Sequence, residues 1–281
     1  NDAVLINQPV YHPFHAAITQ NNRKLINSPL ILKDDHYEID FADLEEKIKT
    51  YKVKAAILCS PHNPVGRVWT KEELRAYAEI CRKYNVAVIC DEIHADFVFK
   101  GHKHIPFASV SKDAADRSVT CTAPSKTFNI AGLQTSNILI PNESIRNKFK
   151  AVLDSFGYER PNVMGIIAAE AAYRGGEEWL AAVWEYIENN LAFTKKFLAD
   201  RLPKMKLIEP EGTYLLWLDF KSLGMKEEQL KDLVENKAKL WLDSGAMFGP
   251  DGEGFERINV ACPREILKQA LTQLAESVHD R

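Results

Sequence analysis

Short apolar runs rich in branched side chains alternate with amphipathic helical patterns through the first half of the chain. Several runs are apolar at every position, so the strands they predict should be buried on both faces. Such alternation is typical of a parallel sheet covered by helices. The predicted strands are residues 4–7, 25–32, 54–60, 86–90, 118–122 and 136–140. The sequence therefore predicts an α/β fold with a mostly parallel central sheet and flanking helices.

Two of the segments between these runs carry signals for the start of a helix. Thr70 and Glu73 form a capping box, in which a hydroxyl and a carboxylate satisfy free amide donors, so a helix should follow to about Tyr84. Asp40 with Asp43 predicts a similar start for a helix that runs through residue 49. We interpret these signals as packing features that carry no chemistry.

The second half of the chain has a different pattern. Apolar residues three or four apart predict one long bridging helix from residue 177 to about 202, and we interpret its Trp-containing stripe as core. Residues 213–220 and 256–260 read as strands, and Pro263 suits the first turn of a terminal helix. We predict two domains, a large one over residues 1–175 and a smaller α+β one, with the bridging helix, over residues 176–281.

Composition limits the classes of function. The chain has 36 Lys and Arg against 39 Asp and Glu, and its net charge of −3 gives no field that would gather nucleic acid. No window approaches the roughly 18 consecutive apolar residues that a membrane span needs. The five cysteines lie mostly in apolar runs and indicate buried thiols in a reducing compartment. We expect a cytoplasmic protein without nucleic-acid or membrane partners.

Four short polar segments occupy places where a predicted strand ends, which is where ligands bind in open α/β sheets. Asp91 closes an apolar strand, where an unpaired charge is costly, so it should have a cationic partner. Lys126 is flanked by small residues at another strand end and could present its amine to an aldehyde. Taken alone, Asp91 could be a helix cap or half of a buried ion pair, and most lysines are surface charges. The segments are residues 8–11 (Gln-Pro-Val-Tyr), 60–66 (Ser-Pro-His-Asn-Pro-Val-Gly), 91–94 (Asp-Glu-Ile-His) and 123–129 (Ala-Pro-Ser-Lys-Thr-Phe-Asn).

Together these segments resemble the pyridoxal phosphate (PLP) enzymes of the class I/II aminotransferase family, which have fold type I. Residues 125–132 (Ser-Lys-Thr-Phe-Asn-Ile-Ala-Gly) and 257–264 (Arg-Ile-Asn-Val-Ala-Cys-Pro-Arg) resemble its cystathionine beta-lyase or carbon-sulfur lyase branch more closely. The similarity spans almost the whole chain. It implies PLP as the cofactor, held mainly by the large domain, an amino acid as the small-molecule substrate, and a homodimer with its sites at the subunit interface.

The resemblance gives central roles to three residues. Lys126 matches the lysine that holds the cofactor and that, once substrate displaces it, removes the alpha proton. Asp91 matches the aspartate that pairs with the protonated pyridine nitrogen and keeps the ring electron-poor. Asn63, held between residues restricted by two prolines, matches the asparagine that contacts the phenolic oxygen. From the residues alone, Asn63 would equally suit a turn.

Further cofactor contacts are implied at the edges of the site. His94 stands where aminotransferases often place a tyrosine, which points toward the lyase branch, with a structural histidine as the alternative. Tyr11 matches the aromatic residue that stacks on the cofactor, with a buried core tyrosine as the alternative. The hydroxyls of Thr122 and Ser125 are candidates for the phosphate. Full aminotransferases commonly carry an arginine eight residues after the lysine, and this chain has Gln134 there, so other groups must balance the phosphate charge.

Arg257 matches the arginine with which the family grips the substrate carboxylate through a planar two-bond fork. The alternative is a surface salt bridge with Glu253 or Glu256. Tyr214, which follows Gly212, is a weaker candidate for the same cleft.

Other chemistries find less support in the sequence. The eight histidines show no ligand spacing with Cys or carboxylates, so we expect no metal site, and no Gly-x-Ser-x-Gly elbow is present. We expect elimination of a thiol from a sulfur amino acid, giving pyruvate and ammonia, although the residues alone equally permit transamination. A third alternative is a truncated, non-catalytic protein. It is motivated by the start at Asn1, because family chains carry a further N-terminal segment that helps to bind the cofactor phosphate and the partner subunit.

Overall fold

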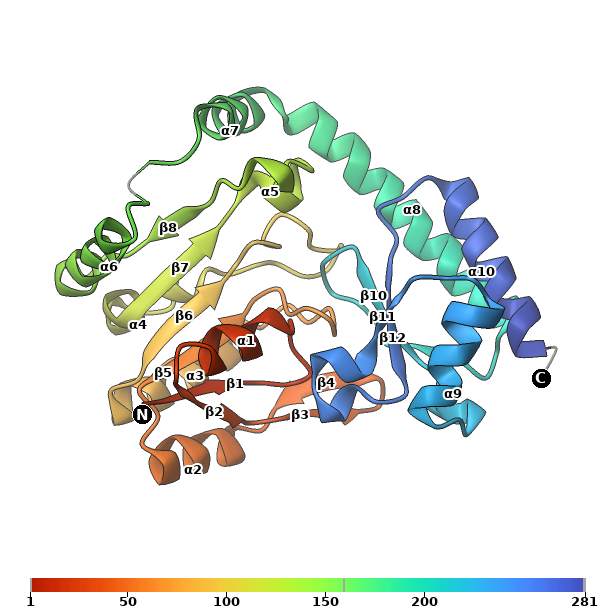
Figure 1. Cartoon of the computed structure of the whole chain (residues 1–281), viewed down its shortest axis with the longest axis horizontal. Helices are drawn as coiled ribbons and strands as arrows, with labels where there is room; N and C mark the ends of the chain where they lie inside the picture. Colours follow the sequence, from red (N-terminus) through yellow and green to blue (C-terminus); the bar gives the residue numbers. More distant parts are fainter. Residues whose placement is uncertain (1, 159, 280–281) are drawn as a thin grey trace.

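The centre of the N-terminal half is a six-stranded sheet. The computed structural model of the chain describes residues 2–158 and 160–279. Along the sheet the strands are β2 (Lys24–Asn27), β1 (Ala3–Ile6), β5 (Ala55–Cys59), β6 (Ala87–Asp91), β7 (Ser118–Thr122) and β8 (Asn137–Leu139) (Figure 1). Neighbouring strands are parallel except for β7 and β8, which are antiparallel. The predicted α/β fold with a mostly parallel central sheet is confirmed.

Helices pack on both faces of this sheet. Helices α2 (Phe41–Tyr51), α3 (Lys71–Tyr84) and α4 (Lys112–Arg117) contact one another in a row and cover one face, onto which Leu5, Leu58 and Val88 point. Helix α1 (Pro13–Thr19) packs on the opposite face against Ile6 and Ile57. Because successive side chains of a strand alternate between faces, one apolar run supplies both cores.

The predicted helix starts are confirmed. The Thr70 hydroxyl accepts the Glu73 amide hydrogen at 3.2 Å, and a Glu73 carboxylate oxygen accepts the Thr70 amide hydrogen at 2.7 Å. The helix that follows, α3, ends at Tyr84 as expected. Asp40 caps α2 by accepting the amide hydrogens of Ala42 and Asp43, and α2 extends to Tyr51, two residues beyond the prediction.

The single strand predicted over residues 25–32 is wrong, because the chain turns at Ser28 and Pro29. Strand β2 ends at Asn27, and β3 (Leu30–Lys33) pairs instead with β4 (His36–Ile39) in a separate hairpin. Proline has no amide hydrogen to give to a ladder, and the Leu30 amide donates to the Gln8 carbonyl at 2.8 Å. The last predicted strand, β8, lies at the sheet edge with all three residues exposed.

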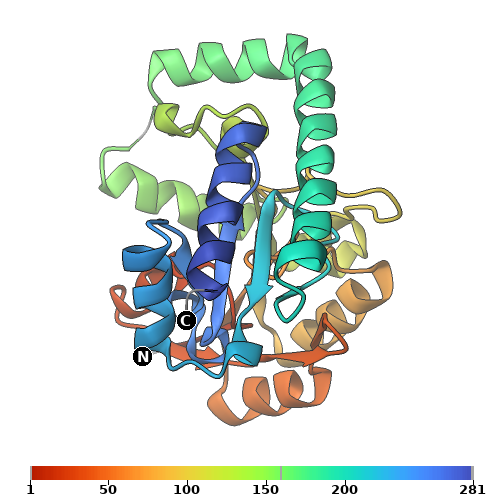
Figure 2. The ribbon, with the colours of Figure 1, turned by 90° about the vertical axis from the view of Figure 1, so that its right-hand side faces the viewer.

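The C-terminal part of the chain forms an antiparallel sheet. Its strands, in order, are β11 (Asp243–Ser244), β12 (Phe255–Asn259), β10 (Leu215–Asp219) and β9 (Lys206–Leu207). Helices α8 (Glu177–Arg201) and α10 (Arg264–His279) pack against this sheet and contact each other (Figure 2). Both helices and the two longer strands lie where they were predicted. A division of the chain into domains at residue 175 stays a prediction.

The remaining helices lie around these two sheets. They are α5 (Pro124–Thr127), α6 (Glu143–Ser155), α7 (Val163–Gly175) and α9 (Glu227–Lys231). Helix α8 runs from the end of α7 to the second sheet, and α6 and α7 lie near the β8 edge of the first sheet (Figure 1). Within the described ranges, none of the helices is long and apolar enough to cross a membrane.

A buried ion-pair network joins the first sheet to the second. Arg67 is 3% exposed; its guanidinium donates to Glu211 and Glu73 at 2.9 Å and lies over the Trp69 ring. It also donates to the Tyr37 carbonyl. Glu211 precedes β10, whereas Arg67 follows the polar segment 60–66. The network therefore fixes that segment relative to the second sheet.

Glu256 on β12 is a buried carboxyl group that should make stability depend on pH. The side chain is 2% exposed, and burial first, then the charges of Glu227 and Asp243, raise its pKa from 4.5 to about 8. Between about pH 4.5 and 8, the folded state therefore keeps a proton on Glu256 that the unfolded chain has released. The unfolding free energy should fall as the pH rises from about 4.5 to 8, by up to about 1.4 kcal/mol per pH unit from this group.

We expect Glu256→Gln to remove this slope, because the amide has no proton to lose. The variant should be more stable than the parent by up to about 4 kcal/mol at pH 7.5 and should differ little at pH 4.5. Urea unfolding across this pH range measures the difference. Glu253→Gln, at an exposed position three residues away, is the control and should keep the parental slope. Parallel pH profiles for Glu256→Gln and the parent would contradict the assignment.

Candidate active site

Asp91 lies at the carboxyl end of β6, between two thiols of the neighbouring strands. It is in register with Cys59 on β5 and with Cys121 on β7, so the three side chains share one face of the sheet. Burial raises the pKa of both thiols, to about 11 for Cys121, and they are neutral at pH 7. Burial also raises the pKa of Asp91, to about 6. Two smaller effects lower this pKa: the Ile93 amide donates to Oδ1 at 3.2 Å, and the charge of Lys126 favours the carboxylate. A carboxylate in this setting favours a cationic ligand.

Lys126 lies on the short helix α5, directly after β7. Its side chain is half-buried and lines a cavity of about 390 Å³. Because β6 and β7 are parallel neighbours, their carboxyl ends meet at one edge, and the Lys126 charge favours the ionised form of Asp91. The structure thus brings the predicted amine and the predicted carboxylate to one site.

His94 is buried in a turn three residues beyond the end of β6, with its ring edge-on to Tyr214 at a centroid distance of 5.6 Å. Burial, helped by the charges of Lys126 and Arg257, lowers its pKa to about 3, so the imidazole is neutral at pH 7. Its Nδ1 is buried and has no hydrogen-bond partner among the residues the structure describes. A buried polar atom without a partner is costly, and a polar ligand would relieve that cost.

Arg257 connects the second sheet to the polar segment 60–66. Its Nη1 donates to Asn63 Oδ1 at 2.8 Å, while Nε and Nη2 donate to Asp243 Oδ2 at 3.1 and 2.5 Å. The salt bridge considered as the alternative is present, but its partner is Asp243 on β11 instead of Glu253 or Glu256, because Asp243 faces Arg257 across the β11–β12 ladder. Asn63 is 5% exposed and keeps its side-chain amide hydrogens for another acceptor.

The other predicted contacts lie at the margins of this group. The Tyr11 amide donates to the Asn63 carbonyl at 3.0 Å, and the half-buried ring stands edge-on to Phe14. Ser125 Oγ donates to the Thr135 carbonyl at 3.2 Å, and Thr122 Oγ1 accepts a long 3.4 Å hydrogen bond from the β8 side chain Asn137. Both hydroxyls therefore already have local partners.

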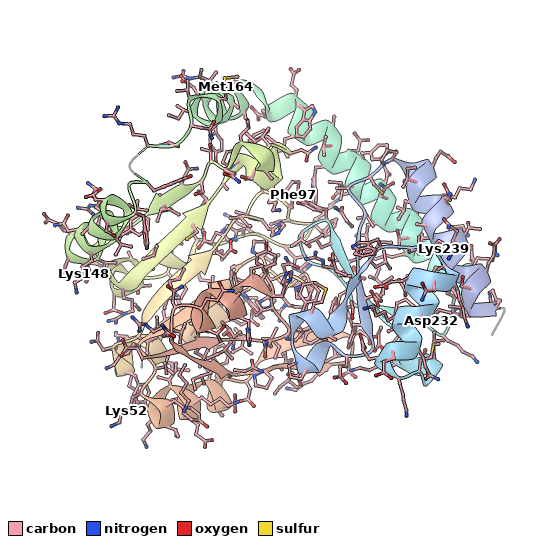
Figure 3. The ribbon with its side chains drawn as sticks, viewed as in Figure 1. Lys52, Phe97, Lys148, Met164, Asp232 and Lys239 are labelled. Atoms are coloured by element: carbon pink, nitrogen blue, oxygen red, sulfur yellow. The ribbon has the colours of Figure 1, made fainter. Side chains whose placement is uncertain are left out.

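One wall of the cavity was not recognised from the sequence. Val183 and Ile187 on α8 line it, whereas Trp184 packs as predicted in the core against Phe97 and Phe99. Phe97, labelled in Figure 3 between α5 and α8, belongs to both the core and the cavity wall. The apolar stripe of a helix predicts that these residues are covered, but it does not say whether protein or ligand covers them.

The arrangement combines an amine, a half-buried carboxyl group, a neutral imidazole, an amide and a guanidinium. It suits proton transfer next to a planar cationic group, with a carboxylate substrate near Arg257. Within residues 2–158 and 160–279, no group of three or more His, Cys, Asp or Glu side chains could hold a metal ion.

Comparisons with known proteins agree with this geometry. The sequence model described as aminotransferase class I and II matches residues 1–274. The chain is 45% identical to cystathionine beta-lyase PatB of Bacillus subtilis, over 97% of this chain and 70% of that protein. The structure of cystalysin from Treponema denticola, which contains a pyridoxal 5'-phosphate cofactor, superposes with a TM-score of 0.97 at 40% identity, over 100% of this chain and 71% of that one. The PLP-bound C-S lyase from Staphylococcus hominis gives 0.92 at 37% identity, over 99% and 70%.

Proposed function

Because the chain belongs to the class I and II aminotransferase family, we propose that it is a PLP-dependent carbon-sulfur beta-lyase. It eliminates the thiol from a sulfur amino acid of the cystathionine type. The observation that carries the proposal is the Lys126 amine within electrostatic reach of the Asp91 carboxyl group, in a chain that is 45% identical to a cystathionine beta-lyase. The reaction consumes one water and converts the thioether amino acid to a thiol, pyruvate and ammonia.

The residues present fit pyridoxal phosphate. Lys126 supplies the amine for its aldehyde, and Asp91 an anionic partner for its ring nitrogen. Asn63, whose oxygen is taken by Arg257, offers its amide hydrogens to the ring oxygen. The buried Nδ1 of His94 has no partner in the described part of the chain, which leaves it available to the same ligand. When bound, the cofactor supplies a conjugated ring that withdraws electrons from the alpha carbon of the substrate.

The chain's own groups then carry the proton and the charge. Lys126 Nζ takes the alpha proton, and the carbon-sulfur bond breaks as the electron pair leaves with the thiolate. Asp91 remains ionised above about pH 6 and balances the positive charge at the ring nitrogen. Arg257 binds the substrate carboxylate, exchanging part of its bonding to Asp243 for the two oxygens of the substrate.

A paired assay tests elimination against transamination. L-Cystathionine or L-cysteine should yield pyruvate and free thiol, measured with lactate dehydrogenase and a thiol reagent. An amino acid supplied with 2-oxoglutarate should yield little glutamate. Glutamate without pyruvate would identify an aminotransferase instead, and neither product from the loaded protein would favour a non-catalytic role.

We also propose a cytoplasmic homodimer. The five cysteines are free thiols, as a reducing compartment requires. Helix α7 and the turn after α6 expose large apolar side chains, with Phe156 80%, Val163 69% and Met164 66% exposed, and Met164 lies at the outer edge of the molecule in Figure 3. Apolar surface of this kind marks a protein interface. Sedimentation at micromolar concentration should give the mass of two chains.

A further inference from the structure

Tyr214 lies immediately before β10 and lines the same cavity as Lys126. Its ring is held edge-on against two neighbours, His94 at a centroid distance of 5.6 Å and Phe97 at 5.0 Å. Burial raises the pKa of Tyr214, and the charge of Arg257 opposes this rise, so the guanidinium lies within electrostatic reach of the hydroxyl. The side chain is therefore close to both the proposed base and the proposed carboxylate site.

The backbone next to Tyr214 is held in a strained conformation. Thr213 is fully buried and has a φ of +67°, a region that β-branched residues rarely adopt. Its amide donates to the Phe97 carbonyl at 2.8 Å, and its Oγ1 both donates to the Leu215 carbonyl and accepts the Leu215 amide hydrogen. The Tyr214 carbonyl accepts the Val260 amide hydrogen at 3.0 Å. Strained residues of this kind cluster at functional sites, where the surrounding contacts fix a side chain in one place.

The Tyr214 hydroxyl has no hydrogen-bond partner among the residues that the structure describes. Thr127, another hydroxyl of the cavity lining, is buried and donates to Asp96 at 2.7 Å. The other side chains of the lining that carry a hydroxyl or an amide are exposed, and they are Asn129, Tyr186 and Asn259. Among the described hydroxyls of the lining, that of Tyr214 alone is both sheltered and unoccupied.

Resting on the proposed function, we propose that Tyr214 is a further catalytic residue, whose hydroxyl donates a hydrogen bond to the substrate sulfur as the carbon-sulfur bond breaks. A substrate with its alpha proton at Lys126 and its carboxylate at Arg257 extends its sulfur along the cavity that Tyr214 lines. The bonding electron pair moves onto sulfur, and the thiolate forms among mainly aromatic and aliphatic side chains, where an unpaired charge is costly. A donor aimed at the atom on which charge develops stabilises the transition state more than the bound substrate.

The hydroxyl acts as a hydrogen-bond donor and keeps its proton. Burial raises the pKa of Tyr214 to about 12, whereas an ordinary thiol has a pKa near about 8.5. The proton therefore stays on the phenol oxygen, and the thiolate takes a proton from water after it leaves. Removal of the alpha proton by Lys126 is a separate event, which the Tyr214 hydroxyl should not affect.

The test is Tyr214→Phe, which removes the hydroxyl and keeps the ring with its contacts to His94 and Phe97. Because the hydroxyl has no protein partner to lose, the variant should fold. Two substrates are compared on the holoenzyme: L-cystathionine releases a thiolate, and β-chloro-L-alanine releases the weakly basic chloride. Pyruvate release from L-cystathionine should lose about 100-fold in kcat/KM, mostly in kcat, as expected for one donor to a developing anion. The value for β-chloro-L-alanine should change by less than about threefold, because chloride needs little stabilisation.

Exchange of the alpha proton gives a readout that does not involve the carbon-sulfur bond. L-Alanine has no leaving group, and proton NMR in D₂O follows the loss of its alpha proton. The exchange rate should be the same in the parent and in Tyr214→Phe, because Lys126 is intact in both. The affinity for pyridoxal phosphate, measured by equilibrium dialysis, should also be unchanged.

Tyr84→Phe is the matched control. Tyr84 is partly buried, as Tyr214 is, and the change likewise removes one hydroxyl. This hydroxyl donates to Glu45 at 3.0 Å, at the end of α3 and outside the cavity lining. The control should behave as the parent does in pyruvate release, in proton exchange and in cofactor binding.

Three results for Tyr214→Phe would overturn the proposal: an equal loss with both substrates, a loss confined to KM, or slower exchange of the alpha proton. Each would mean that the hydroxyl serves binding or shape instead of the leaving group. Any of them, with pyruvate still released by the parent, removes the role of Tyr214 and leaves the lyase function in place. If the parent releases pyruvate from neither substrate, the proposed lyase function itself fails, and the role of the hydroxyl falls with it.

Discussion

Replacement of Lys126 by alanine is expected to lower kcat/KM for thiol elimination by about 10³-fold or more. A positioned base contributes about 10²- to 10⁴-fold to a proton transfer, and the alanine methyl group can neither take the proton nor bind the cofactor aldehyde. The same change should abolish the mass increase that follows borohydride treatment of the loaded protein. Intact-mass spectrometry and pyruvate release measure the two effects on one preparation.

Lys103→Ala is the control for this experiment. Lys103 lies on an exposed loop, so its removal should alter neither the borohydride adduct nor the rate. Circular dichroism should show that both variants keep the parental fold. A Lys126→Ala protein that still gains the adduct in full would show that another amine holds the cofactor, and the proposed site would have to be abandoned.

Local signals in the sequence were sufficient for much of the fold. The capping box at Thr70 and the Asp40 cap specify helix starts through side chains within three residues of the amides they bind. The apolar runs specify strands, and parallel strands place their carboxyl ends at one edge. Asp91 and Lys126 could therefore be predicted to lie at the same edge of the sheet, whereas their proximity depends on β6 and β7 being neighbours.

Features that depend on distant pairing could not be predicted in this way. Asp243 lies on a two-residue strand, and it reaches Arg257 only because β11 pairs with β12. The turn at Ser28 and Pro29 reads as the middle of one strand, since residues 25–26 before it and residues 30–32 after it are apolar. The raised pKa of Glu256 likewise depends on its burial by distant parts of the chain and, to a smaller extent, on acidic side chains from other elements.

The setting of Asp91 links fold to chemistry. A continuous apolar strand brings the carboxyl group to the sheet edge, and the register places neutral thiols on either side. Because its neighbours are apolar and few donors are near, the protein stabilises the negative charge of Asp91 less than water stabilises that of a surface Asp. A cationic ring nitrogen would supply the missing stabilisation.

Asp91→Asn is accordingly expected to weaken binding of pyridoxal phosphate by about 100-fold, because removing one partner of a buried ion pair costs about 3 kcal/mol or more. The amide keeps the shape of the side chain but not its charge. Equilibrium dialysis, with the bound cofactor detected by absorbance, gives the dissociation constants of the parent and of Asp91→Asn. Asp116→Asn, at an exposed position before β7, should bind as the parent does.

The pH dependence separates this charge effect from a loss of packing. The pKa of Asp91 is raised to about 6, so the carboxylate is present above that pH and gains a proton below it. The parent should therefore lose affinity by up to about tenfold per pH unit below 6 through this group. The cofactor phosphate also titrates near pH 6, and it affects both proteins alike. The quantity to compare is therefore the dissociation constant of Asp91→Asn divided by that of the parent. That ratio should fall to about ten at pH 5 and reach its full value at pH 8. A ratio that stays constant across this range would mean that the asparagine variant lost fit rather than charge, and Asp91 would then not be the partner of the ring nitrogen.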